Sequence, residues 1–170
     1  MIMIKENTTS LLGYKAFNKD LTNLWKKKFL IGEKYQVSTE HKECGYHFCP
    51  FLEDVFVFYN DSSNMMVCEV KGSGDIIKYY NDVYDILVYA SSEIEVLKEI
   101  SREEILDYYL SKNDYYVRRI VNFLIRGKLS MEEVKLFKRR FSDNDQIMDT
   151  IRYYYYGDKD VYQRRLSKYR

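Results

Sequence analysis

The chain has 170 residues and a formal net charge of +1, with 46% hydrophobic residues, 18 tyrosines and 9 phenylalanines. This content excludes a disordered polar chain, and a chain of this length buries roughly 70% of its unfolded surface on folding, so metal or disulfide staples are not required. No apolar run reaches the ~20 residues of a membrane span, and the N-terminus lacks the features of a signal peptide, so we expect a cytoplasmic protein that does not enter a membrane.

The first hundred residues are dominated by short segments in which apolar and polar residues alternate, a pattern typical of strands. A short helix is predicted over residues 52–59, because Pro50 favours the start of a helical turn. The segment Gly72-Ser73-Gly74 is expected to end the strand that precedes it. The predicted strands cover residues 13–18, 30–37, 45–51, 65–70, 75–80, 85–90 and 94–100.

The periodicity becomes helical near Ser101. The segments 101–104 and 130–133 both read Ser-x-x-Glu, the capping-box pattern that begins helices. Between them an apolar stripe at helical spacing predicts one helix, which Gly127 is expected to end. The stripe consists of Val117, Ile120, Val121 and Leu124.

Three further helices complete the predicted C-terminal part. After Ser130, the side chains of Val134, Phe137 and Phe141 are expected to face inward. Asp143 or Asn144 is expected to begin the next helix, which ends at Gly157, and a last helix is predicted over residues 158–169. The inward side of the helix before Gly157 is predicted to carry Ile147, Ile151 and Tyr154.

The two periodicities predict an α+β fold, in which a small, mostly antiparallel β domain over residues 1–100 is followed by a helical C-terminal unit over residues 101–170. Charge divides at the same place. Residues 1–100 contain 11 Lys and Arg against 15 Asp and Glu, whereas residues 101–170 contain 16 against 11. This asymmetry indicates two surfaces with different partners.

Three segments of the first part resemble an uncharacterised domain family of bacterial and phage proteins. They are Gly13-Tyr14-Lys15-Ala16-Phe17, Gly45-Tyr46-His47-Phe48-Cys49 and Cys68-Glu69-Val70-Lys71-Gly72-Ser73-Gly74. The resemblance covers residues 10–105. It implies a mostly-β domain encoded in phage or prophage genomes, and it implies no particular activity.

Shorter segments are similar to motifs of the mono-ADP-ribosyltransferases, namely Tyr14-Lys15-Ala16, Gly45-Tyr46-His47-Phe48-Cys49 and Glu93-Ile94-Glu95. This similarity implies that Lys15 contacts a nucleotide, His47 lines a nicotinamide pocket and Glu95 stabilises the developing cation. Lys15 stands where those enzymes have arginine, and lysine cannot make the planar bidentate contact of a guanidinium. An enzyme is therefore the alternative hypothesis.

The segment 41–49 contains both histidines and two of the three cysteines. Cys44, His47 and Cys49 have the chemistry of zinc ligands, but a strand would direct Cys44 and Cys49 to opposite faces, so we expect neither a metal ion nor another cofactor. His47 and Cys49 share one face, which would also suit a nucleophile and its base. The alternative is that Cys49 and Cys68 are small core residues on neighbouring strands.

The helical unit carries basic side chains together with tyrosines, a composition that suits phosphate contacts and base stacking, or an interface with a protein. An ordinary solvated helix surface is the third interpretation. The residues concerned are Arg118, Arg119, Asn122, Arg126, Lys135, Lys138, Arg139, Tyr155 and Tyr156.

The leading hypothesis is a non-enzymatic, phage-type accessory protein that binds and modulates a host macromolecule, such as a counter-defence inhibitor of a nucleic-acid-handling complex. Its partner is expected to be a host protein or ribonucleoprotein, with direct binding of nucleic acid as a variant of the same idea. The alternatives are the ADP-ribosyltransferase-like enzyme and a structural domain without a dedicated site.

Overall fold

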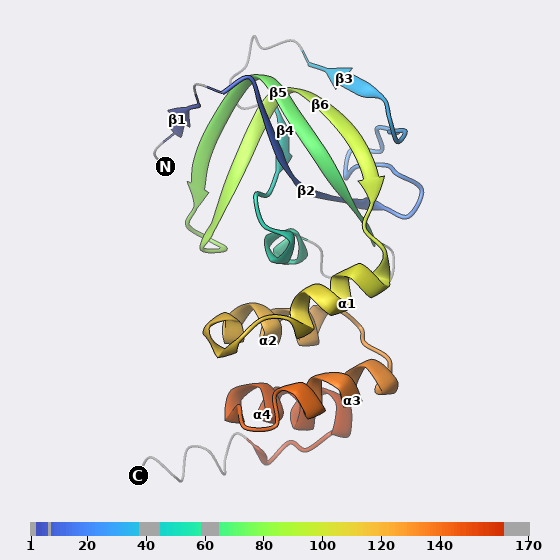
Figure 1. Ribbon diagram of the computed structural model, residues 1–170, viewed down its shortest axis with the longest axis vertical. Helices are drawn as coiled ribbons and strands as arrows, with labels where there is room; N and C mark the ends of the chain where they lie inside the picture. The colour runs from blue at the N-terminus through green and yellow to red at the C-terminus, as the bar shows by residue number, and fades with distance from the viewer. Residues whose placement is uncertain (1–2, 7, 38–44, 59–64, 162–170) are drawn as a thin grey trace. The chain divides into compact units, whose positions relative to one another are not determined.

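The computed structural model describes the whole chain except residues 1–2, 7, 38–44, 59–64 and 162–170 (Figure 1). The chain divides into two compact units, Met1–Ser101 and Arg102–Arg170. Strands occupy the first unit and α-helices the second, which confirms the predicted α+β class. Within the described residues, no helix has the length and apolar character needed to cross a membrane.

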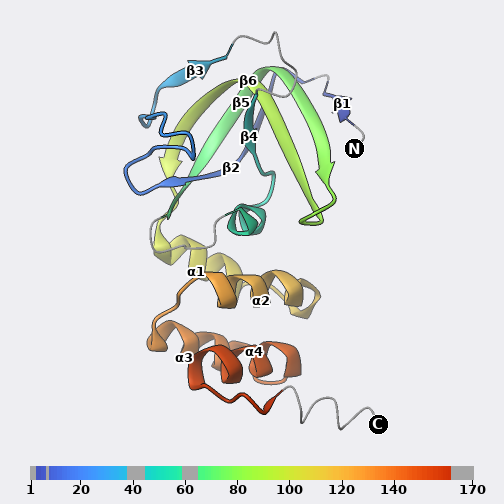
Figure 2. The same ribbon diagram turned by 180° about the vertical axis from the view of Figure 1, so that it is seen from behind.

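The first unit is a six-stranded sheet in which every pair of neighbouring strands is antiparallel. Its centre is the hairpin formed by β5 and β6, which Figure 1 and Figure 2 show as long, strongly curved strands. The elements are β1 (Met3–Lys5), β2 (Ser10–Asn18), β3 (Lys34–Gln36), β4 (Tyr46–Phe48), the 3-10 helix η1 (Leu52–Val57), β5 (Met65–Asn81) and β6 (Ile86–Glu99).

The curvature of the hairpin lets the sheet close on itself. β2 pairs with the first half of β5, and β4 pairs with the first half of β6. β2 and β4 then meet, because the backbone N–H groups of Tyr14 and Cys49 each donate to the other's carbonyl oxygen, at 2.7 and 2.8 Å. The circuit β2–β5–β6–β4 therefore surrounds part of the core, as in a small barrel.

The prediction that a strand ends at residues 72–74 is wrong, because β5 continues through them to Asn81. Gly72 keeps its place in the ladder, paired with both Leu11 and Ile94. Gly74 has a φ of +76°, and the register with β6 shifts between Ser73 and Ile76. The glycines therefore bend β5 instead of ending it, and the strands predicted over 85–90 and 94–100 are likewise one strand, β6.

The other predicted elements of this unit occur with changed bounds. The strand predicted over 13–18 is longer, since β2 begins at Ser10, and the others are shorter. Of the strand predicted over 30–37, only Lys34–Gln36 is a strand, because Gly32 turns the chain with a φ of +83°. Of the strand predicted over 45–51, Tyr46–Phe48 forms β4. The helix predicted over 52–59 is the 3-10 helix η1.

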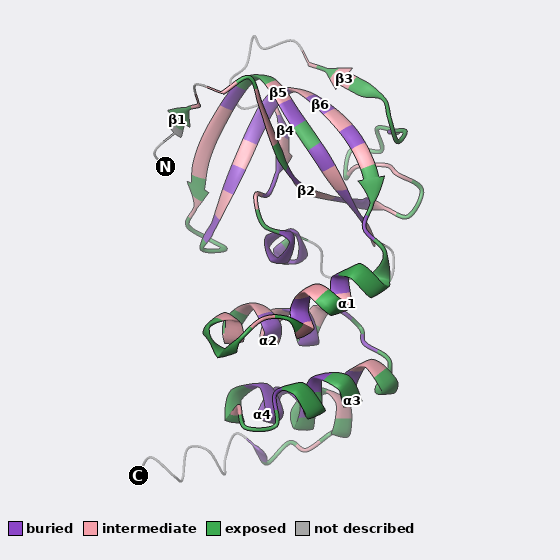
Figure 3. Ribbon diagram, viewed as in Figure 1, coloured by how far each residue is buried: buried purple, intermediate pink, exposed green. Residues whose placement is uncertain are grey.

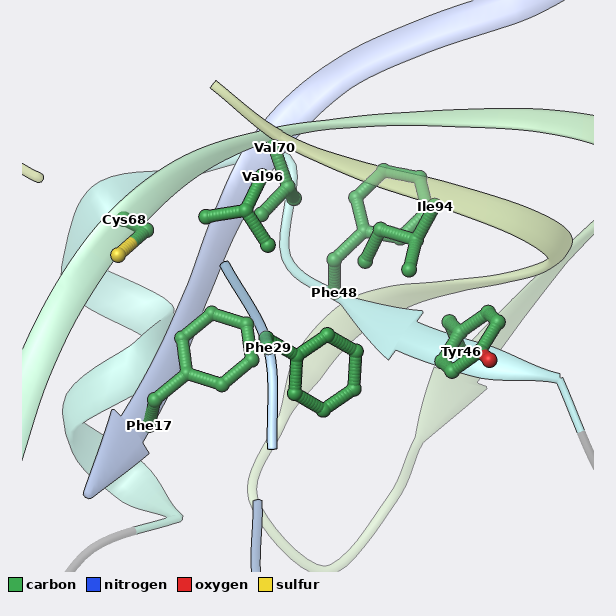
Figure 4. Packing of buried hydrophobic residues seen from close by; sticks show 8 residues of the cluster. All are labelled: Phe17, Phe29, Tyr46, Phe48, Cys68, Val70, Ile94 and Val96. Atoms are coloured by element: carbon green, nitrogen blue, oxygen red, sulfur yellow. The ribbon is translucent and has the colours of Figure 1, made fainter. Parts of the chain in front are cut away.

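One cluster of buried side chains forms the core inside the curved sheet (Figure 4). The rings of Phe17 and Phe29 lie 5.0 Å apart between centroids, and those of Phe29 and Tyr46 lie 6.0 Å apart. Figure 3 shows the matching alternation of buried and less buried residues along β6. The cluster consists of Phe17, Phe29, Tyr46, Phe48, Cys68, Val70, Ile94 and Val96.

The second unit consists of short helices whose ends follow the local sequence signals. Ser130 and Glu133 form the predicted capping box, and the Asn144 side chain accepts a hydrogen bond from the Ile147 amide. Gly127 follows α2, and Gly157 ends α4 with a φ of +71°. The elements are α1 (Arg102–Leu110), the 3-10 helix η3 (Asp114–Tyr116), α2 (Val117–Arg126), α3 (Met131–Arg140) and α4 (Asp145–Tyr156). Of the helix predicted over 158–169, residues 162–169 lie outside the described residues.

Aromatic and aliphatic side chains form the core of this unit, and the rings of Tyr109 and Phe123 stack at 4.0 Å between centroids. The predicted inward residues Val134, Phe137 and Phe141 are buried, which confirms that part of the pattern. Tyr154 was predicted inward but is 49% exposed, and the neighbouring Tyr155 turns inward instead. Successive residues of a helix point in directions about 100° apart, so the prediction placed the inward face one residue too early.

Removal of the capping box should weaken the second unit measurably. Ser130 accepts a hydrogen bond from the Glu133 amide, and the Glu133 carboxylate accepts one from the Ser130 amide. We expect Ser130→Ala to lower the free energy of unfolding by about 1 kcal/mol in denaturant titrations. Ser142→Ala removes an exposed hydroxyl and is the matched control, with an expected change within about 0.5 kcal/mol. Equal losses in the two variants would contradict the assignment.

Candidate functional site

A cavity of about 660 Å³ opens in the first unit, and its described lining residues come from β2, the loop after it, β4, η1, β5 and β6. Most of these side chains are aromatic or aliphatic, and the charged ones are Lys15 and Lys27. Among the described residues, no Asp or Glu lines it. Its size lies in the range of about 300–1,000 Å³ that is usual for small-molecule sites. We call it the Trp25 cavity, because Trp25 also lines it.

The loop over residues 18–29, here the Trp25 loop, carries Trp25 to the edge of this cavity. Hydrogen bonds within the loop fix its conformation. The Asn23 side-chain oxygen accepts from the Trp25 amide at 3.0 Å and from the Lys27 amide at 2.9 Å. A β-bridge joins Thr22 to Lys28. The loop ends at Phe29, which is fully buried in the core.

Two residues of the Trp25 loop adopt a backbone conformation that is unfavourable for residues with a Cβ atom. Leu21 and Lys26 have φ values of 58° and 62°, in the left-handed region where residues other than glycine are uncommon. Such residues persist only where their surroundings fix them, and they cluster at functional sites. The loop presents Trp25 with 80% of its surface exposed.

Lys15 brings a cation into the lining of the cavity. It lies on β2, and its ammonium group donates a hydrogen bond to the His47 carbonyl oxygen at 2.6 Å. Removal from water lowers the pKa of Lys15 from 10.5 to about 8, and the nearby Cys49 thiol acts in the opposite direction with a smaller effect. At neutral pH this side chain is therefore mostly protonated but poorly hydrated.

His47 and Tyr79, which both line the cavity, form a polar pair. Nδ1 of His47 and the Tyr79 hydroxyl lie 2.7 Å apart, and their rings meet edge to face. Burial raises the pKa of Tyr79, with a smaller contribution from Cys49, so the phenol stays neutral. The alternation predicted for β4 holds here, since Tyr46 and Phe48 lie in the core cluster while His47 contacts Tyr79.

Lys27 supplies the second cation of the lining. Its ammonium group donates to the Tyr46 hydroxyl and lies 4.8 Å from the centroid of that ring. It also lies over the rings of Phe29 and Tyr35, at 5.6 and 5.4 Å. Contacts with three aromatic faces hold this flexible side chain beside the cavity.

The structure brings together two of the three residues proposed for catalysis. Lys15 and His47 are in contact, but Glu95 pairs with Lys71 of β5, which pairs in turn with Leu12 of β2. Directly paired residues place their side chains on one face of a sheet, and Leu12 and Lys15 are three residues apart in one strand. Glu95 therefore lies on the opposite face from Lys15, and the transferase arrangement is not formed.

The proposed zinc ligands do not assemble among the described residues. Cys44 lies outside them, and no group of three or more His, Cys, Asp or Glu side chains elsewhere in the described chain is placed to hold a metal ion. Cys49 and Cys68 are both buried, as the alternative expected, but they are not on neighbouring strands. Cys49 bridges Tyr14 and Cys68 pairs with Lys15, so β2 lies between the two cysteines. Burial, with a smaller effect of Glu99, raises the pKa of Cys68 to about 12, so this thiol is unreactive.

The family relationship of the chain follows from a comparison with protein-family models. Residues 11–108, more than half of the chain, match the model described as domain of unknown function DUF7666. The chain belongs to the DUF7666 family. No curated protein and no solved structure matches it. The predicted membership of an uncharacterised family over residues 10–105 is confirmed at this level, and the phage association stays a prediction.

The DUF7666 region contains every described residue that lines the Trp25 cavity. Sequence reasoning identified Lys15 and His47 but missed Trp25, Lys27 and Tyr79. A signal for the loop was present, because the only tryptophan of the chain stands in Leu24-Trp25-Lys26-Lys27-Lys28, where an apolar pair precedes three cations. The contribution of Tyr79 follows only from strand register.

All nine of the predicted partner-binding residues lie beyond the DUF7666 region, on α2, α3 and α4. Lys135, Lys138 and Arg139 are exposed on α3, and Lys135 pairs with Glu132 at 2.6 Å. Lys138 lies 5.5 Å from the ring of the exposed Tyr156. On α2, Arg118 is exposed, whereas Arg119, Asn122 and Arg126 are half-buried.

Tyr155 is placed differently from the other predicted partner residues. Its hydroxyl donates to the Leu124 carbonyl oxygen at 2.5 Å and accepts from the Leu129 amide at 3.3 Å. Burial raises the pKa of this phenol. The hydroxyl of Tyr155 therefore joins α4 to the end of α2 inside the helical unit.

Proposed function

We propose that this DUF7666 protein is a non-enzymatic binding protein, and that the Trp25 cavity receives its ligand or a segment of its partner. The observation that carries the proposal is the Trp25 loop. A hydrogen-bonded loop with two left-handed residues holds the only tryptophan 80% exposed beside a cavity of ligand size. An exposed tryptophan on a rigid support is a typical anchor for binding, because little conformational entropy is lost on contact.

Binding explains the polar groups of the cavity better than catalysis does. The Lys15 ammonium group is bonded to a backbone carbonyl, and Nδ1 of His47 is bonded to a phenol. Glu95, the carboxylate expected for a transferase, lies across the sheet.

The single tryptophan makes the proposal directly testable. An anilinonaphthalene sulfonate dye, which combines flat rings with an anionic group, is the probe. We expect the dye to quench Trp25 emission and to gain emission itself by energy transfer, with saturation at one dye per chain. Trp25→Ala should weaken dye binding, measured by calorimetry, by about tenfold, because an exposed aromatic anchor contributes more than 1 kcal/mol.

Tyr115→Ala is the matched control, because Tyr115 is 90% exposed and lies in the helical unit. Both variants should keep the free energy of unfolding within about 0.5 kcal/mol of the parent, as is usual for surface positions. Dye binding that Trp25→Ala leaves unchanged, or a parent that binds no dye, would refute the proposal.

A second candidate function concerns the helical unit, where α3 presents Lys138 and Arg139 to solvent and Lys138 lies over the ring of the exposed Tyr156. We propose that this surface contacts a host macromolecule, in line with the prediction of a phage-type accessory protein or counter-defence inhibitor. The excess of 16 Lys and Arg over 11 Asp and Glu after residue 100 favours an acidic partner surface.

Charge reversal tests this second candidate. Lys138→Glu should reduce recovery of the partner in affinity capture from host lysate by about tenfold, and the loss should shrink at high salt because exposed charges are screened. Lys159→Glu makes the same charge change at another exposed position of the helical unit. Equal losses for both variants would show that net charge, and not this surface, is recognised, and nuclease treatment separates protein from nucleic-acid partners.

A further inference from the structure

We infer that the Trp25 cavity selects organic anions, that is, ligands with one acidic group on an apolar, ring-containing body, and that the acidic group is seated at Lys15. This inference rests on the proposed binding function and adds the chemical class of the ligand. It depends on the charge of the lining, the position of Lys15 and the character of the remaining surface.

The charge of the cavity is opposite to that of the unit around it. Residues 1–100 have four more acidic than basic side chains, yet the charged residues that the described lining contains are Lys15 and Lys27. With cations present and carboxylates absent from the described lining, a cationic ligand would be repelled. An anion would gain two favourable partners in a partly dehydrated site, where charge interactions are stronger than in water.

Lys15 is placed to hold an acidic group in a fixed position. An ammonium group has three donors, and in the described structure one of them is bonded to the His47 carbonyl oxygen. The side chain starts from β2, a regular strand whose pairing with β5 covers all nine of its residues. A ligand carboxylate or phosphate at this cation would supply a countercharge that is absent from the described part of the lining.

Lys27 contributes a second, more exposed cation. Its position over the rings of Phe29, Tyr35 and Tyr46 keeps it beside the cavity. The two lysines therefore differ in role: Lys27 attracts the anion from solvent, and Lys15 receives it inside.

The rest of the lining requires an apolar body. Rings of Tyr14, Trp25, Phe48 and Phe58 and the aliphatic side chains of Leu24 and Val55 form much of it. A small inorganic anion would leave most of about 660 Å³ unfilled and would bury no apolar surface. Flat rings are favoured over other apolar groups, because exposed Trp25 offers a large aromatic face for stacking.

A matched pair of probes tests the inference. Naphthalene carboxylate and naphthalene carboxamide have the same ring system and nearly the same size, but only the first is charged. By calorimetry we expect the carboxylate to bind the full chain at least tenfold more tightly than the amide. Inorganic phosphate at the same concentration should give no binding signal.

Lys15→Met should lower the carboxylate-to-amide ratio markedly, because its side chain keeps the length of the lysine stem without the charge, and Lys27 then remains as the one cation of the described lining. Lys71→Met is the control, since Lys71 is exposed on the opposite face of the sheet, and it should leave the ratio unchanged. Equal binding of carboxylate and amide by the parent, or a ratio that Lys15→Met leaves unchanged, would overturn the inference while leaving the binding function intact. Failure of both ring probes to bind would contradict the proposed function as well.

Discussion

Replacement of Gly13 by alanine is expected to destabilise the first unit by about 3–5 kcal/mol. A Cβ atom at Gly13 would lie 2.5 Å from the Cys49 carbonyl oxygen and 2.6 Å from Cδ2 of Phe48. Relief of this overlap would push β2 away from β4. The shift would break the two hydrogen bonds that join Tyr14 to Cys49 and would loosen Phe48 in the core.

Denaturant titration of the parent and the variant measures this loss as a change in midpoint at constant slope. Gly32→Ala is the matched control, because Gly32 has a φ of +83° but no atom within 4 Å of an added Cβ. The control should lose about 1 kcal/mol, the usual penalty of a left-handed backbone. Closure of the sheet through β2 and β4 would be disproved by a Gly13→Ala variant no less stable than Gly32→Ala.

Replacement of Lys15 by methionine, in contrast to Gly13→Ala, should stabilise the protein and raise the free energy of unfolding at pH 7. The folded state holds the lysine with a pKa of about 8 against its ordinary value of 10.5, so burial of the charged form is unfavourable. The full shift corresponds to roughly 3 kcal/mol, and a gain of about 1–2 kcal/mol is expected because solvent still reaches part of the side chain. A stabilised variant with impaired anion binding is the signature of a functional residue.

The pH dependence of the same comparison identifies its cause. Below about pH 8 the lysine is protonated in both states, so the whole destabilisation is present. Between about pH 8 and pH 10 the folded protein has lost the proton and the unfolded chain still holds it, so the parent gains stability as pH rises. The stability difference between Lys15→Met and the parent should therefore narrow over this range.

Other groups around Lys15 also titrate, which is why the difference between variants is the informative quantity. Cys49, His47 and Tyr79 lie around it, and the burial of Cys68 destabilises the folded state at high pH, because its thiol stays protonated to about pH 12. These contributions are present in both proteins and largely cancel in the difference. A gap that stays constant from pH 7 to pH 10 would show that desolvation of Lys15 is not the cause.

The helical unit was the part that sequence reasoning predicted best, because its signals are local. Ser130, Asn144 and Gly157 fix helix ends through hydrogen bonds and backbone conformation within a few residues. The error at Tyr154 arose where four consecutive tyrosines give the hydrophobic pattern no contrast. The neighbouring Tyr155 is distinguished only by its contacts with Leu124 and Leu129.

The sheet was predicted in fragments because its defining contacts are distant in sequence. Gly72 and Gly74 read as a turn from local propensity, but the pairing of β5 with β2 and β6 overrides it. The absence of a Cβ at Gly72 admits Phe48, whose ring would lie within 2.6 Å of that atom. The same glycines can form a turn that ends a strand or a bend within one strand, and only pairing with the neighbouring strands decides between the two outcomes.

The candidate site could be predicted only in part for the same reason. Lys15 and His47 came from resemblance to motifs, and their contact depends on the meeting of β2 and β4. The motif resemblance gave Glu95 a catalytic role, but the pairing register of β5 and β6 places it on the face of the sheet opposite Lys15. Trp25 stands in a loop without strand or helix periodicity. Its exposed position depends on hydrogen bonds to Asn23, which no sequence pattern predicts.

Nuclear magnetic resonance of the single indole group tests most directly whether the Trp25 cavity is a binding site. The chain has one tryptophan, so a nitrogen-15-labelled sample shows one indole N–H signal, that of Trp25. Titration with naphthalene carboxylate should shift this signal progressively and saturably in the parent protein, and markedly less in Lys15→Met at the same concentrations. An indole signal that stays unmoved while other residues respond to the ligand would place binding elsewhere and contradict the proposal.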